Sequence, residues 1–197
     1  VGVGALTSNT GGGGNIAVGT GVLNNNLIGN NNVGIGNTSL FSNTTGTRNI
    51  SIGGGAMFAN TVGTSNVALG VYSLYCNTAS NNVAIGYKSL FANTTGVCNT
   101  AVGTSALRFN TIGDRNTAVG TSALRYNTTG ICNTTVGHRS LYSNTGGSEN
   151  TSIGIQALFA NTTGGSNTAM GRNALFCNTT GINNIAVGNQ SLNYNIV

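Results

Sequence analysis

The sequence repeats itself with a period of 17 along its whole length. An Asn followed by two residues, an aliphatic residue or Met, and Gly recurs at Asn15, Asn32, Asn49, Asn66, Asn82, Asn99, Asn116, Asn133, Asn150, Asn167 and Asn184. Only the step from Asn66 to Asn82 is shorter, by a single position. Such a period is typical of solenoids, whose repeats cannot bury a core alone and stack on their neighbours. We interpret residues 1–197 as a single tandem-repeat domain of twelve coils, two of them partial, within a longer chain or fibre subunit.

Each coil follows one pattern, which residues 116–132 illustrate with NTAVGTSALRYNTTGIC. Numbered from the first Asn, positions 2 and 4 alternate with a small residue at position 3, as in Ile50, Ser51 and Ile52. This alternation predicts a strand with one buried face. The aliphatic residue of position 4 and the Leu of position 9 predict a narrow, dry interior. A coil of this length has room for two short strands and two corners, so the expected fold class is an all-β, parallel β-solenoid or β-roll.

Two glycine positions and two asparagine positions are nearly constant. Gly at positions 5 and 15 predicts corners that need a positive φ or have no room for a Cβ. Asn at positions 1 and 12 would stack in register, so that each amide bonds its neighbours above and below and also caps the turn backbone.

Charge is scarce and restricted to a few columns. Only 5% of the residues are charged, against roughly 25% in an ordinary domain, and the net charge is +5. The charges and the one His occupy positions 6, 7, 10, 16 and 17, so we expect these positions to face solvent. Seven dispersed basic residues do not predict a nucleic-acid surface. No apolar run has the ~18 residues of a membrane span, so we expect no membrane insertion of this segment.

Aromatic residues gather at position 10 and form the candidate site of the sequence. The stripe consists of Phe41, Phe58, Tyr75, Phe91, Tyr142, Phe159 and Phe176. In two middle coils Arg108 and Arg125 take this position, and Phe109 and Tyr126 follow at position 11. Because Arg occurs in it, the column should reach the surface, where aligned aromatic residues often mark an interface. A contact between chains is the first interpretation; rings that only stack on each other, and a glycan-binding stripe, are the alternatives.

The sequence predicts no catalytic residue, no metal ligand set and no cofactor, and therefore no enzyme. Asp114 and Glu149 lie two coils apart in adjacent columns, near the separation used by inverting glycosidases, but both sit at variable surface positions. His138 has no acidic partner at a readable spacing. Cys98 and Cys132 share a column about 9.6 Å apart, beyond the ~7 Å reach of a disulfide. With Cys76 and Cys177 we expect them to be half-buried thiols, with disulfides between chains as the alternative.

The repeat resembles two groups of proteins. The NVAIG of residues 82–86 and the NTAVG of residues 99–103 resemble the core of the head repeat in YadA-like trimeric autotransporter adhesins. The NTAVGTSALRYNTTG of residues 116–130 is similar to the NTAVGxxALxxNTTG repeat of phage and giant-virus tail-fibre-like proteins. The resemblance covers all twelve coils. It implies a left-handed parallel β-roll, a homotrimer, and an adhesive or shaft role.

From these observations we expect a structural or adhesive fibre segment, the shaft or head of an extracellular, cell-surface or virion-surface appendage. The expected partners are copies of the chain itself, as a homotrimer or an end-to-end polymer, and a host surface receptor or glycan. Both ends break off in repeat register, which also fits a filament subunit that stacks end to end. Ice binding is a further alternative, since Thr recurs at position 13 in ten coils, although its setting resembles a corner more than a flat face.

Overall fold

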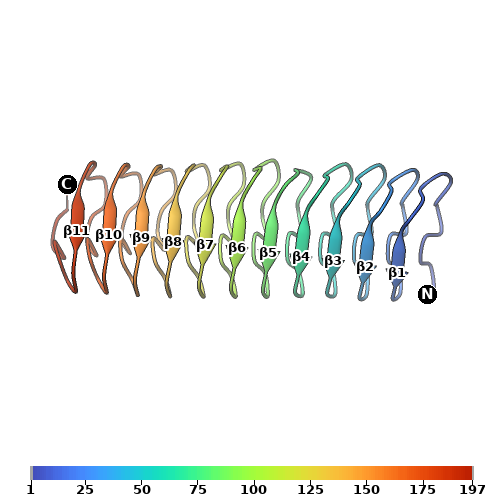
Figure 1. Ribbon diagram of the computed structural model, residues 1–197, viewed down its shortest axis with the longest axis horizontal. Helices are drawn as coiled ribbons and strands as arrows, with labels where there is room; N and C mark the ends of the chain where they lie inside the picture. Colours follow the sequence, from blue (N-terminus) through green and yellow to red (C-terminus); the bar gives the residue numbers. More distant parts are fainter. Residues whose placement is uncertain (1, 197) are drawn as a thin grey trace.

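The chain forms an elongated stack of coils, and its two ends lie at opposite ends of the stack (Figure 1). This computed structural model describes residues 2–196. Each coil from residue 15 onward contributes one short strand, and the strands form a single parallel sheet in chain order from β1 to β11. The strands are β1 (Ile16–Val18), β2 (Val33–Ile35), β3 (Ile50–Ile52), β4 (Val67–Leu69), β5 (Val83–Ile85), β6 (Thr100–Val102), β7 (Thr117–Val119), β8 (Thr134–Val136), β9 (Thr151–Ile153), β10 (Thr168–Met170) and β11 (Ile185–Val187). The predicted parallel β-solenoid is confirmed.

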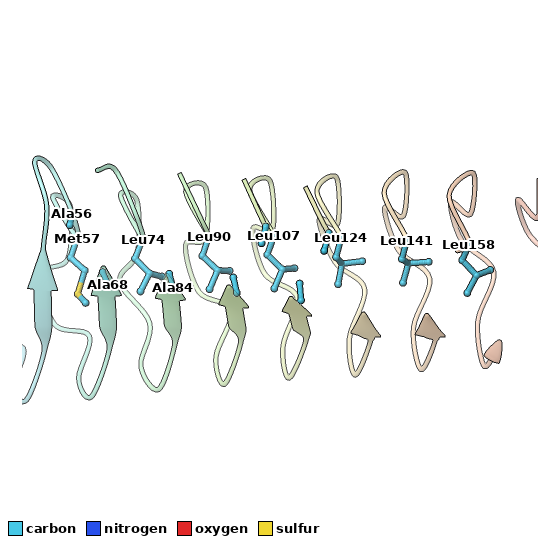
Figure 2. Packing of buried hydrophobic residues seen from close by; sticks show 14 of the residues in the cluster. Ala56, Met57, Ala68, Leu74, Ala84, Leu90, Leu107, Leu124, Leu141 and Leu158 are labelled. Carbon is cyan, nitrogen blue, oxygen red and sulfur yellow. The ribbon is translucent and has the colours of Figure 1, made fainter. Parts of the chain in front are cut away.

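Every strand buries its middle residue and leaves the residues on either side half-buried or exposed. Ala68 in β4 and Ala101 in β6 are fully buried, whereas Leu69 is 44% exposed and Val119 in β7 is 36% exposed. The prediction that position 4 lines the interior is therefore wrong. The interior is too narrow for two large side chains, because the Leu of position 9 reaches across it from the opposite wall (Figure 2). Only Gly, Ala, Ser or Thr stands at position 3.

The opposite wall of each coil is a turn and not the second strand that the sequence predicted. Ser105 and Leu107, at positions 7 and 9, have φ of 58° and 50°, which lies outside the β region. The peptide groups nevertheless bond from coil to coil. The Leu107 N–H donates to the Ala123 carbonyl at 3.0 Å, and the Phe109 N–H to the Arg125 carbonyl at 3.0 Å. This wall is consequently as continuous along the stack as the sheet is.

Side-chain size is matched between the two walls. Val22 is the one residue larger than Ala or Ser at position 8, and Gly34 stands at position 3 of the next coil. A Cβ on Gly34 would lie 2.4 Å from Cγ1 of the buried Val22. Elsewhere Ser39 donates to the hydroxyl of Ser51 at 2.7 Å across the same space. The core is thus a file of Leu against small residues, with little spare volume.

Two ladders of buried Asn run along the stack, as the sequence predicted. At position 12 the Asn110 Nδ2 donates to the Asn93 Oδ1 at 2.8 Å and to the Gly113 carbonyl of its own coil at 2.9 Å. At position 1 the Asn116 backbone N–H and Nδ2 both donate to the Asn99 Oδ1, at 3.0 and 3.2 Å. The Asn99 Nδ2 donates to the same Gly113 carbonyl at 2.8 Å. Both ladders therefore hold the corner of each coil closed and also join that coil to its neighbour.

Both glycine positions have the predicted reason. Gly103, at position 5, has φ of 131°, and a Cβ on it would lie 2.6 Å from the Gly120 carbonyl oxygen. At position 15 the φ is not positive, but a Cβ on Gly113 would lie 2.4 Å from the Gly130 carbonyl oxygen. Neither position can carry a side chain without displacing the backbone of the next coil.

In the shortened coil that begins at Asn66, the missing residue is accommodated at a corner. The Ala79 carbonyl takes the place of the usual Gly carbonyl and accepts from the Nδ2 atoms of Asn66 and Asn77, each at 2.8 Å. The strands on either side stay in register, with Val67 opposite Val83. The sheet therefore continues through the shortened coil without a break.

Candidate interaction surfaces

The outer face of the sheet carries an unbroken column of aliphatic residues or Met at position 4, beside a second column at position 2 that is aliphatic in part of the strands. Positions 2 and 4 point outward from all the strands, and the sequence analysis had placed position 4 inside. Exposed large apolar residues of this face include Ile50 at 43%, Leu69 at 44%, Val136 at 40% and Met170 at 41%. The small buried residue at position 3 was the signal that could have revealed this orientation. Eleven strands about 4.8 Å apart make the face roughly 500 Å² in area, near the largest patch that a monomer usually exposes.

Position 2 forms one edge of this face, and its residue type changes along the stack. Position 2 is aliphatic in β1 to β5 and becomes Thr in β6 to β10. The threonines are in register, so that Thr100 pairs with Thr117 and Thr134 with Thr151. The face therefore has a fully aliphatic half and a half in which a Thr column runs beside an aliphatic column.

The aromatic stripe forms stacks along the turn wall. Phe41, Phe58, Tyr75 and Phe91 are half-buried, and their ring centroids are 5.2 or 5.3 Å apart with nearly parallel planes. Tyr142, Phe159 and Phe176 form a second stack with centroids 5.2 and 5.0 Å apart. Phe109 and Tyr126 stack with each other in the neighbouring column between them. Stacking of the rings is therefore present, and a contact of this stripe with another chain stays a prediction.

Four cations lie against these rings in four consecutive coils. Arg108 lies 5.0 Å from the Phe109 centroid, and Arg125 lies 5.5 Å from the Tyr126 centroid and 5.9 Å from that of Tyr142. The Lys88 Nζ and the Arg139 Cζ make similar contacts, at 5.7 Å to Phe91 and 5.6 Å to Tyr142. We call Lys88, Arg108, Arg125, Arg139 and the rings beside them the cationic flank. These cations are dispersed in the sequence, and the fold brings them together because consecutive coils stack.

The cationic flank begins at a shallow hollow. Tyr72, Tyr75, Lys88 and Phe91 line a space of about 370 Å³. Tyr72 meets Tyr75 edge to face, with an interplanar angle of 75°, so its ring lies outside the stack and is 40% exposed. The Lys88 Nζ lies 5.8 Å from the Tyr72 centroid and 5.1 Å from that of Tyr87, which is 47% exposed.

Asp114 and Glu149, considered above as a pair of acids, accept hydrogen bonds from different groups. The Asp114 Oδ1 accepts a hydrogen bond from the Val97 N–H at 2.8 Å, and the Glu149 Oε2 accepts one from the Ser166 hydroxyl at 3.2 Å. None of the charged residues is buried, as their restricted positions predicted. Over residues 2–196 no three His, Cys, Asp or Glu side chains come together in a way that could hold a metal ion.

All four cysteines are free thiols. Cys76, Cys132 and Cys177 are half-buried as expected, but Cys98 is exposed. Burial raises the pKa of the Cys76 thiol, so this group stays protonated and weakly nucleophilic at neutral pH.

The Thr column at position 13, the basis for considering ice binding, is engaged within the protein. The Thr94 hydroxyl donates to the Thr111 carbonyl at 3.0 Å, and the Thr111 hydroxyl to the Thr128 carbonyl at 3.0 Å. The same bond recurs at Thr128, Thr145 and Thr162. These hydroxyls hold corners together, as the sequence analysis expected of this position.

The described part of the chain contains no helix that would cross a membrane. No protein-family model, no curated protein and no solved structure matches the sequence. The outer sheet face and the cationic flank are therefore the two features of the molecule that bear on its function.

Proposed function

We propose that this chain is a structural segment of an extracellular or virion-surface fibre, in which copies associate side by side through the outer face of the sheet. The observation that carries the proposal is the apolar outer face itself. A monomeric protein would be expected to place polar residues at positions 2 and 4, yet position 4 is aliphatic or Met in every strand. A surface of this kind is stabilised when a second apolar surface covers it.

The size of the face sets the expected strength of association. Its roughly 500 Å² is below the ~800 Å² that each partner contributes to a standard stable interface. We therefore expect a homo-oligomer, such as the trimer that the repeat resemblance implies, with an affinity in the micromolar range for a segment of this length. Each further coil would enlarge the face by the same increment, which suits a long fibre.

Lysine in the centre of the outer face should abolish this association. We expect Val119→Lys combined with Ile153→Lys to give a monomer at concentrations where the unaltered chain is oligomeric, because two ammonium groups would be desolvated in the interface. Multi-angle light scattering after size-exclusion chromatography measures the mass.

Two further variants identify the surface responsible. Thr163→Lys, at an exposed corner, should leave the mass unchanged. Phe58→Ser tests the aromatic stripe, and a monomer from this variant alone would assign the interface to the stripe and overturn our choice of face. A mass that grows without limit as concentration rises would favour the filament that stacks end to end.

A second candidate function, ice binding, has one observation in its favour. Thr100, Thr117, Thr134, Thr151 and Thr168 form a register-matched column on the outer face, a better placed column than the threonines of position 13. The column covers only β6 to β10, and the other half of the face is aliphatic. We expect the purified chain to show no thermal hysteresis beyond that of an inert protein at equal concentration. Hysteresis that disappears in Thr134→Leu would replace the fibre proposal with ice binding.

A further inference from the structure

We propose that the cationic flank binds a linear acidic polysaccharide, one with carboxylate or sulfate groups along its chain. The inference gives an adhesive role to the proposed fibre, but the binding belongs to the isolated chain and does not require the fibre to form. Three features support this: positive charge with no acidic partner, open aromatic rings at one end of it, and a turn wall in which every second backbone N–H bonds from coil to coil.

The four cations, at positions 7 and 10 of their coils, have no acidic counterpart. Lys88, Arg108, Arg125 and Arg139 come from consecutive coils, so their spacing along the stack is about 4.8 Å per step. Both acids of the chain occupy other columns and accept hydrogen bonds there. The Nε atoms of Arg108 and Arg125 are buried and have no acceptor among the described residues. These Nε atoms are out of reach of a ligand, so an anion would bind the other N–H groups of the two guanidinium groups, which have no acidic partner. Carboxylate and sulfate accept charge-assisted hydrogen bonds of this kind.

Open rings lie where the row begins. The hollow at Tyr72 and Lys88 offers an exposed ring beside an ammonium group, and Tyr87 offers a second exposed ring 5.1 Å from the same ammonium group. A sugar presents an apolar face of C–H groups and an equatorial rim of polar groups. One acidic sugar can therefore pack its face on Tyr72 while its anionic group meets Lys88.

The same geometry disfavours two other polyanions. Single-stranded nucleic acids bind by stacking bases on open aromatic faces, but most rings of the flank already cover each other's faces within the stacks. An acidic peptide that added a strand would need an open edge of free backbone groups. The flank runs along the turn wall instead, where every second residue donates to the next coil, as the Ala92 N–H does to the Arg108 carbonyl at 3.0 Å. A polysaccharide needs no free backbone groups and no continuous series of open rings, because the hollow at Tyr72 accommodates a single sugar.

Binding of labelled probes to the purified chain tests the proposal. The probes are polygalacturonate, dextran sulfate and neutral dextran, followed by fluorescence anisotropy at physiological salt. We expect binding to polygalacturonate, dextran sulfate or both, and none to neutral dextran. Lys88→Ala and Arg125→Ala should each weaken binding about tenfold, the usual consequence of losing one charge-assisted contact. Lys88→Arg should retain most of the affinity.

Matched controls separate a built site from diffuse attraction. Arg115→Ala removes the same charge from the coil of Arg108, but from an exposed position in another column, and should change the affinity less than twofold. Equal losses from Arg115→Ala and Lys88→Ala would overturn the proposal, as would an absence of binding to both acidic probes. Tighter binding of oligo(dT) than of either polysaccharide would assign the flank to nucleic acid instead. The mass of Lys88→Ala in solution reports on the fibre proposal separately, because Lys88 lies outside the outer sheet face.

Discussion

Replacing the buried Asn110 with Asp is expected to lower the melting temperature by roughly 8–16 °C, which corresponds to about 4 kcal/mol in a chain of this size. The Asn110 Nδ2 donates to Asn93 Oδ1 and to the Gly113 carbonyl, and both bonds would be lost. The carboxylate would instead face these two oxygens inside a dry stack, which adds repulsion to the desolvation of a charge. Thermal melting followed by circular dichroism measures the effect.

The effect of Asn110→Asp should depend on pH in a defined direction. Burial and the neighbouring oxygens would hold the pKa of this carboxyl above its unfolded value of about 3.9. Below that value both states are protonated and the neutral acid can donate one hydrogen bond, so the variant should be least destabilised there. The loss should grow as pH rises through the unfolded pKa and level off above the folded pKa. Asn37→Asp, an exposed site with the same change of charge, is the control and should melt close to the unaltered chain at every pH. Equal melting of the two variants at pH 7 would mean that the position-12 ladder does not stabilise the stack.

Alanine at Gly103 is expected to destabilise the chain by at least about 3 kcal/mol, or roughly 6–12 °C in melting temperature. The φ of 131° at this residue is one that side chains rarely adopt, and the new Cβ would lie 2.6 Å from the Gly120 carbonyl oxygen. That oxygen belongs to the backbone of the next coil, so relief requires a shift that breaks the register of the stack. The loss should therefore be larger than strain at one residue would cause alone.

Gly54→Ala provides the matched comparison for Gly103→Ala. Gly54 adjoins a position-5 glycine, but the nearest atom to a Cβ on Gly54 is 4.0 Å away. The same substitution there should be neutral or slightly stabilising, because Ala restricts the unfolded chain more than Gly does. A comparable loss from both variants would show that lost backbone freedom, and not the close approach of coils, determines the importance of position 5.

The repeat predicted the solenoid because one period has one physical cause. Asn at positions 1 and 12 and Gly at positions 5 and 15 recur in nearly every coil, and each makes contacts that only a stack of identical neighbours can supply. Charge restricted to a few columns correctly indicated that the charged side chains are not buried. It did not mark all solvent-facing positions, because positions 2 and 4 are exposed without charge, and position 7 is buried at Ser105 and Ser122. Because the coils of a stack have equivalent neighbours, a residue type that recurs at one position has the same surroundings in each coil.

The orientation of position 4 could not be read from its apolar character. An aliphatic residue beside a small one fits a strand that buries either of them, and the usual expectation buries the larger. The choice depends on the width of the coil. Leu at position 9 already occupies that width. Leu107 and the small Ala118 are both fully buried, whereas Val119 is turned to the outside. The apolar outer face, and with it the proposed interface, follows from this exclusion.

The sequence by itself determined the period, the parallel stacking, the two Asn ladders and the need for Gly at two corners, because these features depend on contacts between identical positions of neighbouring coils. Only the tertiary structure decided which face of the strand is buried, that position 9 and most residues at position 7 adopt a positive φ without being Gly, and that four cations lie beside aromatic rings. These features depend on contacts across one coil, between positions such as 3 and 9 or 7 and 10. A repeating sequence does not show how each coil closes upon itself, since that is set by the space the side chains leave one another.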